Sequence, residues 1–369
     1  MEFTIHNQVL LTIFVIALVM GAVANKTNFC TMGAVSDWIN MGDTGRLRAW
    51  LLSMAVAILG VAALTYSGSA SIGSDTFPPY RTPNFAWLRY LVGGFMFGVG
   101  MTLGSGCGNK TLIRIGGGNL KSLFVLVVAA ISAYFMLWTD FYGNVFNPWV
   151  SATTIDLAKS GLQSQALSEF FGAGRGAQVA TGAVIGLALA GFVFASRDFR
   201  GSFDNVLAGL VIGLSVVIGW YVTAGPMGAE WREWAEMADT VPSRVQVQSF
   251  TFISPMGDSV RYLLNPANFS LINFGVTALA GVILGSGLYS LFSGNFRLEW
   301  FASVGDFLSH AAGAALMGIG GVLAMGCTIG QAITGVSTLA MGSFLTFFSI
   351  VAGAVATMKF QYWRMMREA

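Results

Sequence analysis

The chain has three cysteines, and two of them end copies of one sequence pattern. The stretches 98–107 and 318–327 are each glycine-rich and each close in Gly-Cys, with a constant offset of 220 residues. A thiol is soft and polarizable and carries a weak S–H donor, so it suits a ligand that presents sulfur. The repeated positions are Gly93, Gly98, Gly100, Leu103, Gly106 and Cys107, matched by Gly313, Gly318, Gly320, Leu323, Gly326 and Cys327.

Glycines flank both of these cysteines, at Gly104, Gly106, Gly108 and Gly326. Glycine lets a backbone approach a ligand closely and adopt positive φ, which we expect beside each cysteine. Hydrophobic segments that break at glycine in corresponding positions of two halves indicate the binding site of a transporter. Short helices that begin at such breaks direct unpaired N–H groups and a positive dipole end into the cavity, so the expected ligand is a small anion.

The third cysteine, Cys30, follows the first hydrophobic segment within Asn28-Phe29-Cys30-Thr31-Met32-Gly33. Its counterpart in the second half is predicted at 251–259, which has no cysteine. Lys110 lies three residues after Cys107 and is a candidate for substrate contact. Each residue also has a simpler interpretation, because a buried cysteine packs as a small hydrophobe and a lysine at a helix end anchors topology. No CxxC or Cys/His spacing indicates a disulfide framework, a metal site or a cofactor.

Composition defines the elements that must position these residues. Apolar residues make up 55% of the chain, charged residues 10%, and the mean hydropathy is +0.68, which is typical of an integral membrane protein. Segments of about 20 apolar residues are long enough to cross a bilayer. The predicted fold is all-α, a single transmembrane domain over 1–369 with about nine spanning helices, at 8–24, 48–67, 87–105, 120–139, 176–195, 204–222, 270–292, 301–323 and 339–358.

Pairing the two Gly-Cys patterns makes the third predicted span equivalent to the eighth. The first repeat then covers about 8–140, the second about 204–358, and 176–195 is the extra helix. A shift of five spans reverses the topology, so the halves form an inverted repeat. The segments 107–118 and 327–335 are too short to cross a bilayer and are predicted as re-entrant helices.

Positive charges predict the orientation. Twelve Lys and Arg residues fall on the side of the C-terminus and seven on the other, which favours an outer N-terminus and a cytoplasmic C-terminus in a bacterial inner membrane. The net charge of +2 without a basic tail gives no support for nucleic-acid binding.

Taken together, Gly104-Ser105-Gly106-Cys107, Met325-Gly326-Cys327 and the early Cys30 segment resemble the YeeE/YedE family of inner-membrane sulfur-compound transporters. The resemblance covers essentially the whole chain. It implies two inverted halves, short re-entrant helices, and thiosulfate uptake past Cys30, Cys107 and Cys327. It also implies a separate cytoplasmic TusA-like sulfur carrier as a partner. The second copy has Ala324 where the first has Gly104, a departure that leaves its backbone path open.

We therefore predict a transporter, not an enzyme, that carries thiosulfate along cysteine thiols and half-helix N-termini. One alternative is the transport of another sulfur or selenium oxyanion. Another is a membrane thiol oxidoreductase, which would need cysteines close enough to pair, with Cα atoms within roughly 7 Å.

Overall fold

The computed structural model describes residues 4–172, 174–238 and 240–368. Within that part of the chain, nine helices are long and apolar enough to cross a membrane, which confirms the predicted all-α membrane fold. The spanning helices are α1 (Ile5–Lys26), α3 (Gly45–Ser67), α4 (Trp87–Leu103), α6 (Leu120–Trp138), α8 (Arg175–Phe194), α10 (Phe203–Ala224), α13 (Phe274–Phe292), α14 (Val304–Leu323) and α15 (Met341–Glu368).

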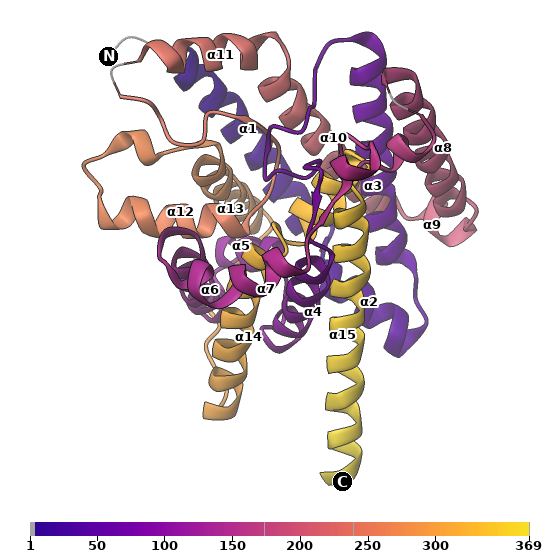
Figure 1. The fold of residues 1–369 in the computed structure, drawn as a ribbon. Coiled ribbons are helices and arrows are strands. Elements are labelled where there is room, and N and C mark those ends of the chain that lie inside the picture. Colours follow the sequence, from indigo (N-terminus) through magenta and orange to yellow (C-terminus); the bar gives the residue numbers. More distant parts are fainter. Residues whose placement is uncertain (1–3, 173, 239, 369) are drawn as a thin grey trace.

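The last helix differs most from its prediction. It ends at Glu368, ten residues beyond the predicted 358, because the residues that follow position 358 include good helix formers and no glycine or proline. In Figure 1 this yellow helix projects from the bundle and carries the C-terminus away from the end where the N-terminus lies.

Four of the spanning helices, α1, α6, α13 and α14, begin at a polar side chain that accepts a backbone N–H of the first turn. Asn119 Oδ1 accepts from Ser122 N at 2.8 Å at the start of α6, and Asn273 Oδ1 accepts from Val276 N at 3.1 Å at the start of α13. These caps satisfy donors that the lipid-facing part of a helix could not leave exposed. They help to fix where these four helices start.

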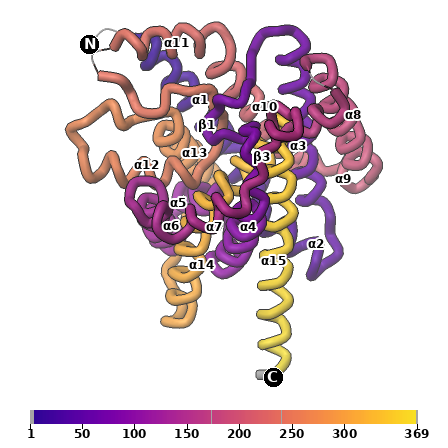
Figure 2. The backbone as a smooth tube through the Cα atoms, in the orientation of Figure 1, coloured from indigo at the N-terminus to yellow at the C-terminus, as the bar shows by residue number. Residues whose placement is uncertain are grey.

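Shorter elements fill the gaps between the spans. Two pairs of two-residue strands tie loops together, with β1 parallel to β4 and β2 antiparallel to β3. Figure 2 traces how these segments connect the helices. The short helices are α2 (Thr31–Met41), α5 (Gly108–Gly116), α7 (Asn147–Ala152), α9 (Arg197–Gly201), α11 (Pro226–Met237) and α12 (Ile253–Leu264); the strands are β1 (Thr76–Phe77), β2 (Asn84–Phe85), β3 (Ile155–Asp156) and β4 (Val247–Gln248); the 3-10 and π turns are Tyr142–Phe146, Leu157–Ser160, Leu167–Phe170, Phe269–Leu271 and Gly330–Gly335.

Helices from the two ends of the chain pack against each other rather than against their sequence neighbours. Helix α1 packs on α13 and α3 packs on α10, while α4 packs on α15 and α6 packs on α14. If α1, α3, α4 and α6 are matched with α10, α13, α14 and α15, each of these pairings has its counterpart. The cysteine-bearing segments therefore lie where the two sets of helices interlock.

The contact between α4 and α14 is made through glycine. A Cβ built on Gly100 would lie 2.6 Å from Gly313 O and 2.7 Å from Met317 N; on Gly320 it would lie 2.8 Å from Gly93 O and 2.7 Å from Phe97 N. The neighbours of Gly100 become those of Gly320 when 220 is subtracted from their residue numbers. The two helices run antiparallel, and each ends four residues before a cysteine, at Leu103 and Leu323.

Candidate functional site

All three cysteines follow the same kind of helix end. The residue two positions before each cysteine has a left-handed backbone, with φ of 51° at Asn28, 57° at Ser105 and 61° at Met325. Positive φ was expected at Gly106 and Gly326; that expectation is wrong, because the left-handed residue lies one position earlier in each copy.

The hydrogen bonds at these ends are those of a Schellman motif, in which the N–H after the left-handed residue reaches back five positions. Gly106 N donates to Met101 O at 2.8 Å, and Gly326 N donates to Gly321 O at 2.8 Å. Phe29 N donates to Ala24 O at 3.0 Å in the third copy. The motif satisfies the last carbonyls of each helix and turns the chain sharply into the cysteine.

The substitution of Ala324 for Gly104 does not alter the backbone path. Gly104 has φ −83° and ψ 7°, and Ala324 has φ −77° and ψ 0°. Both conformations have negative φ, so an alanine side chain causes no backbone strain. Gly104 instead provides space, since a Cβ there would lie 3.0 Å from Met317 Cε on α14.

Each cysteine also stands at the N-cap of the helix that follows. Cys30 Sγ accepts from Gly33 N at 3.3 Å at the start of α2, and Cys327 Sγ accepts from Gly330 N at 3.4 Å. Cys107 precedes α5, and its sulfur faces the backbone N–H of Lys110 without the close geometry of the other two caps. Its thiol also interacts with the thiol of Cys30 and with the hydroxyl of Thr328.

The structure brings the three thiols to one region of the interior. All three are buried, with exposed fractions of 6% at Cys30, 1% at Cys107 and 0% at Cys327. Electrostatic interaction links Cys107 with Cys327 as well as with Cys30. Because each thiol marks a helix N-terminus, positive dipole ends converge there from α2, α5 and the helical turn that contains Gly330–Gly335.

The N-terminus of a fourth helix, α12, also lies at Cys327. The backbone N–H groups of Phe252 and Ile329 are directed at its sulfur, as is the hydroxyl of Thr251. Phe252 is the N-cap of α12, so the predicted counterpart 251–259 does form the start of a short helix at the site. Gly108 lies against the same helix, with a hypothetical Cβ 3.4 Å from Met256 Cε.

Lys110 extends a positive charge toward Cys30 and Cys107. Its Nζ donates to Asn28 Oδ1 at 3.1 Å, which links α5 to the left-handed turn before Cys30. The other charged side chains that interact with it are Arg114 and Arg46, so among the described residues it has no carboxylate partner. Gly106 and Gly326 sit at the turns, next to Lys110 and Gln331 respectively.

Buried polar atoms without a hydrogen-bond partner gather around these thiols. Among the described residues, Asn109 Oδ1 and the Tyr80 hydroxyl have no partner, and the hydroxyls of Thr251 and Thr328 meet only cysteine sulfur. Burial raises the pKa of Tyr80, with a further contribution from Cys327, so its hydroxyl remains a neutral donor. An unpaired buried polar group costs about 1–3 kcal/mol, so several together indicate a place for a polar ligand.

Three residues with a role at the breaks were not predicted from the sequence. Arg114 donates to Ser105 O at 2.7 Å, Gln331 donates to Ala324 O at 2.5 Å, and Arg89 donates to Leu323 O at 2.7 Å. They satisfy carbonyls that the helix ends leave open. The two arginines resembled ordinary topology signals, and the contact of Arg89 joins residues 234 positions apart.

The chain matches a known protein family. The sequence profile of the family described as "Sulphur transport", also called YeeE/YedE, matches residues 26–356 of the 369. The chain belongs to the sulphur transport family. The matched region contains all three cysteine turns and all four helix N-termini.

Two relatives match over almost the whole chain. A thiosulfate transporter TsuA from Spirochaeta thermophila is 24% identical over 347 residues, covering 92% of this chain and 94% of the relative. A thiosulfate transporter TsuA from Escherichia coli is 22% identical over 372 residues, covering 95% and 94%. This member of the sulphur transport family is therefore a multi-pass membrane transporter and not an enzyme.

Proposed function

We propose that this protein takes up thiosulfate across the bacterial inner membrane, with its N-terminus outside and its C-terminus in the cytoplasm. The observation that carries the proposal is the convergence of three cysteine-capped helix N-termini on a region where buried polar atoms have no partner. The names of the two relatives support thiosulfate as the substrate.

The chemistry of the site fits a dianion that has a terminal sulfur. Helix dipoles, backbone N–H groups and the Lys110 ammonium attract the charge, and the thiols of Cys30, Cys107 and Cys327 donate weak S–H hydrogen bonds to the soft atom. Successive short-lived bonds let the anion pass between the thiols without a covalent intermediate. Gly104, Gly106, Gly108 and Gly326 keep the path open by lacking side chains.

The halves would then act as an inverted repeat, 8–140 and 204–358, with α8 as the extra helix. The short helices after each cysteine enter the membrane without crossing it, since the nine residues of α5 span only about 14 Å. A separate TusA-like carrier would receive the sulfur compound on the cytoplasmic side.

Uptake of labelled thiosulfate into membrane vesicles tests the proposal. We expect Cys107→Ala to lower the rate to near background while the protein stays folded in the membrane. Cys327→Ala should act similarly, and Cys30→Ala more mildly. Serine at position 107 should restore part of the rate at most, because a hydroxyl is a harder donor. Wild-type uptake by the Cys107→Ala protein would refute the assigned role.

Competition identifies the substrate class. Thiosulfate and sulfate have the same charge and similar size, and they differ in the terminal sulfur, so the thiols must discriminate between them. Excess sulfate should compete poorly with labelled thiosulfate, and anions with a soft terminal atom should compete better. Equal competition by sulfate would indicate a general oxyanion carrier.

A further inference from the structure

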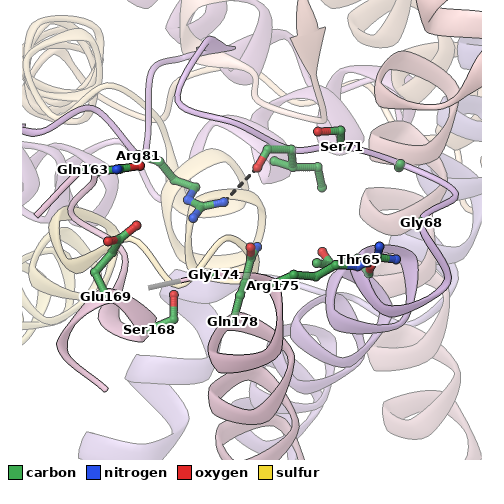
Figure 3. A pocket seen from close by; sticks show the side chains of 12 residues that line it. Thr65, Gly68, Ser71, Arg81, Gln163, Ser168, Glu169, Gly174, Arg175 and Gln178 are labelled. Carbon is green, nitrogen blue, oxygen red and sulfur yellow. Dashed lines mark hydrogen bonds between the residues drawn. The ribbon is translucent and has the colours of Figure 1, made fainter. Parts of the chain in front are cut away.

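A polar cavity lies at the end of the bundle opposite the C-terminus. It has a volume of about 400 Å³ and is lined by residues from α3, α8, the loops on both sides of β1 and the loop that precedes α8. Figure 3 shows Arg81 entering it from one side and Arg175 and Gln178 from α8. The volume falls in the range of small-molecule sites.

Arg81 is the residue that makes this cavity unusual. The residue is only 9% exposed, yet its buried Nε–H has no hydrogen-bond partner. One other nitrogen of the guanidinium donates to Ile72 O at 2.8 Å. An unsatisfied donor on a buried cation is costly, so the guanidinium is set up to receive an acceptor from within the cavity.

The charges around Arg81 favour an anion. Burial lowers the pKa of Arg81, and Glu169 opposes that shift. The Glu169 carboxylate accepts from Ser164 Oγ at 3.1 Å, and no ion pair within 4.0 Å joins it to Arg81 in the described part of the chain. Arg175 adds a second positive charge at the cavity, where it also holds Thr65 O at 2.5 Å. A guanidinium remains protonated at physiological pH, so the cavity carries two positive charges against one negative.

Tyr80, the sequence neighbour of Arg81, lies between the cavity and the thiols. Tyr80, next to Arg81, packs against the turn Gly330–Gly335, where a Cβ on Gly335 would lie 2.9 Å from its ring, and interacts with Cys327. The loop that carries Gln163 and Glu169 is pinned to the start of α15, where Met341 N donates to Gln165 O at 2.9 Å. A ligand in the cavity is therefore separated from the thiols by the Tyr80 side chain and this loop.

We propose that this cavity is a binding site for a small divalent oxyanion, with Arg81 as the main residue that binds it. The cavity would capture the substrate before the substrate passes Tyr80 and reaches Cys327. The inference rests on the proposed function for the identity of the anion, and thiosulfate is the probe. Arg81 would bind oxygen atoms through its guanidinium, whereas the cysteines recognise the sulfur. The two sites would thus divide charge recognition from sulfur recognition.

Two substitutions make the cavity less positive in different ways. Arg81→Gln removes the charge, and Gln178→Glu places a negative charge in the cavity without disturbing the bond from Arg81 to Ile72 O. We expect each to raise the thiosulfate concentration that gives half-maximal uptake about tenfold, with little change in the maximal rate. Arg81→Lys should recover part of the loss, since it keeps the charge but lacks the planar donor set.

Matched controls separate a local site from general surface charge. Lys159→Gln removes an exposed positive charge from the same face, and Gln246→Glu adds a negative one at an exposed position. Both should leave the half-maximal concentration within about twofold of wild type. Size-exclusion profiles in detergent verify that each protein is folded.

Calorimetric titration of purified protein with thiosulfate separates this inference from the proposed function. Measured in a Cys107→Ala background, residual binding that Arg81→Gln abolishes supports the site, even if vesicles of the wild-type protein show no thiosulfate uptake and the proposed function fails. Unchanged half-maximal concentrations in both Arg81→Gln and Gln178→Glu, with binding retained, would overturn the site while leaving the thiosulfate transporter intact.

Discussion

The close contact between α4 and α14 leads to a prediction about Gly100 and its counterpart Gly320. An alanine Cβ at Gly100 would lie 2.6 Å from Gly313 O, whereas ordinary contacts begin at 3.4 Å. The nearest atoms must therefore separate by 0.8 Å (3.4 − 2.6). At Gly320 the shortest contact is 2.7 Å, to Phe97 N, and the separation is 0.7 Å (3.4 − 2.7).

Overpacking of this kind costs about 1–3 kcal/mol. Replacing glycine by alanine inside a helix returns roughly 0.5–1 kcal/mol. We therefore expect Gly100→Ala and Gly320→Ala each to destabilise the protein by about 0.5–2 kcal/mol. The two effects should be similar because the surrounding atoms correspond.

Transport should suffer more than stability. Both helices end in the turns that place Cys107 and Cys327, and binding groups must be held to within about 0.5 Å of their working positions. A shift of 0.7–0.8 Å exceeds that tolerance. Thiosulfate uptake in vesicles should therefore fall several-fold in both variants.

The matched control is Gly191→Ala in α8, where an added Cβ would meet no heavy atom within 4 Å. Thermal unfolding in detergent should show a midpoint lowered by a few degrees for the two contact variants and unchanged or raised for the control. The reasoning would be refuted if Gly100→Ala and Gly320→Ala both behaved like Gly191→Ala. A defect in only one of them would show that the two contacts are not equivalent.

Three other predictions concern the turns and their support. Lys110→Gln should raise the half-maximal thiosulfate concentration in vesicle uptake by about tenfold, and Lys110→Arg should raise it much less. Equal effects of the two substitutions would show that the positive charge of Lys110 does not contribute to binding. Gly326→Ala should impair uptake more than Gly106→Ala, because its Cβ would lie 3.2 Å from the backbone nitrogen of Gln331, whereas at Gly106 the nearest atoms, at 3.3 Å, belong to the Lys110 side chain; the reverse order would contradict this. Asp258→Ala should lower the unfolding midpoint strongly, by an amount corresponding to roughly 3–5 kcal/mol, since it leaves the buried guanidinium of Arg244 unpaired, and a midpoint near that of wild type would show that the ion pair is dispensable.

The local sequence was sufficient to predict the spanning helices and the turns that precede Cys107 and Cys327. Spans of about 20 apolar residues can satisfy their backbone in lipid only as helices, so hydropathy alone predicted all nine. The repeated Gly-Cys pattern likewise marked the turns, because a helix that stops beside a cysteine leaves a local signature. The conformation of those turns was not predicted, since Ser105 and Met325 adopt the left-handed backbone that was expected of the neighbouring glycines.

Only the tertiary structure decided which distant groups meet. The sequence correspondence cannot show that Cys107 faces Cys30 and Thr328, or that α12 directs its N-terminus at Cys327. The cavity at Arg81 had no local signal, because its walls come from segments around residues 65–81 and 163–178, and the arginine stands in an unremarkable loop. Helix formation in a membrane depends on short-range hydropathy and hydrogen bonding, and so is encoded locally. The placement of a charge or a thiol depends on which helices pack together, and here the packing partners lie in opposite halves of the chain.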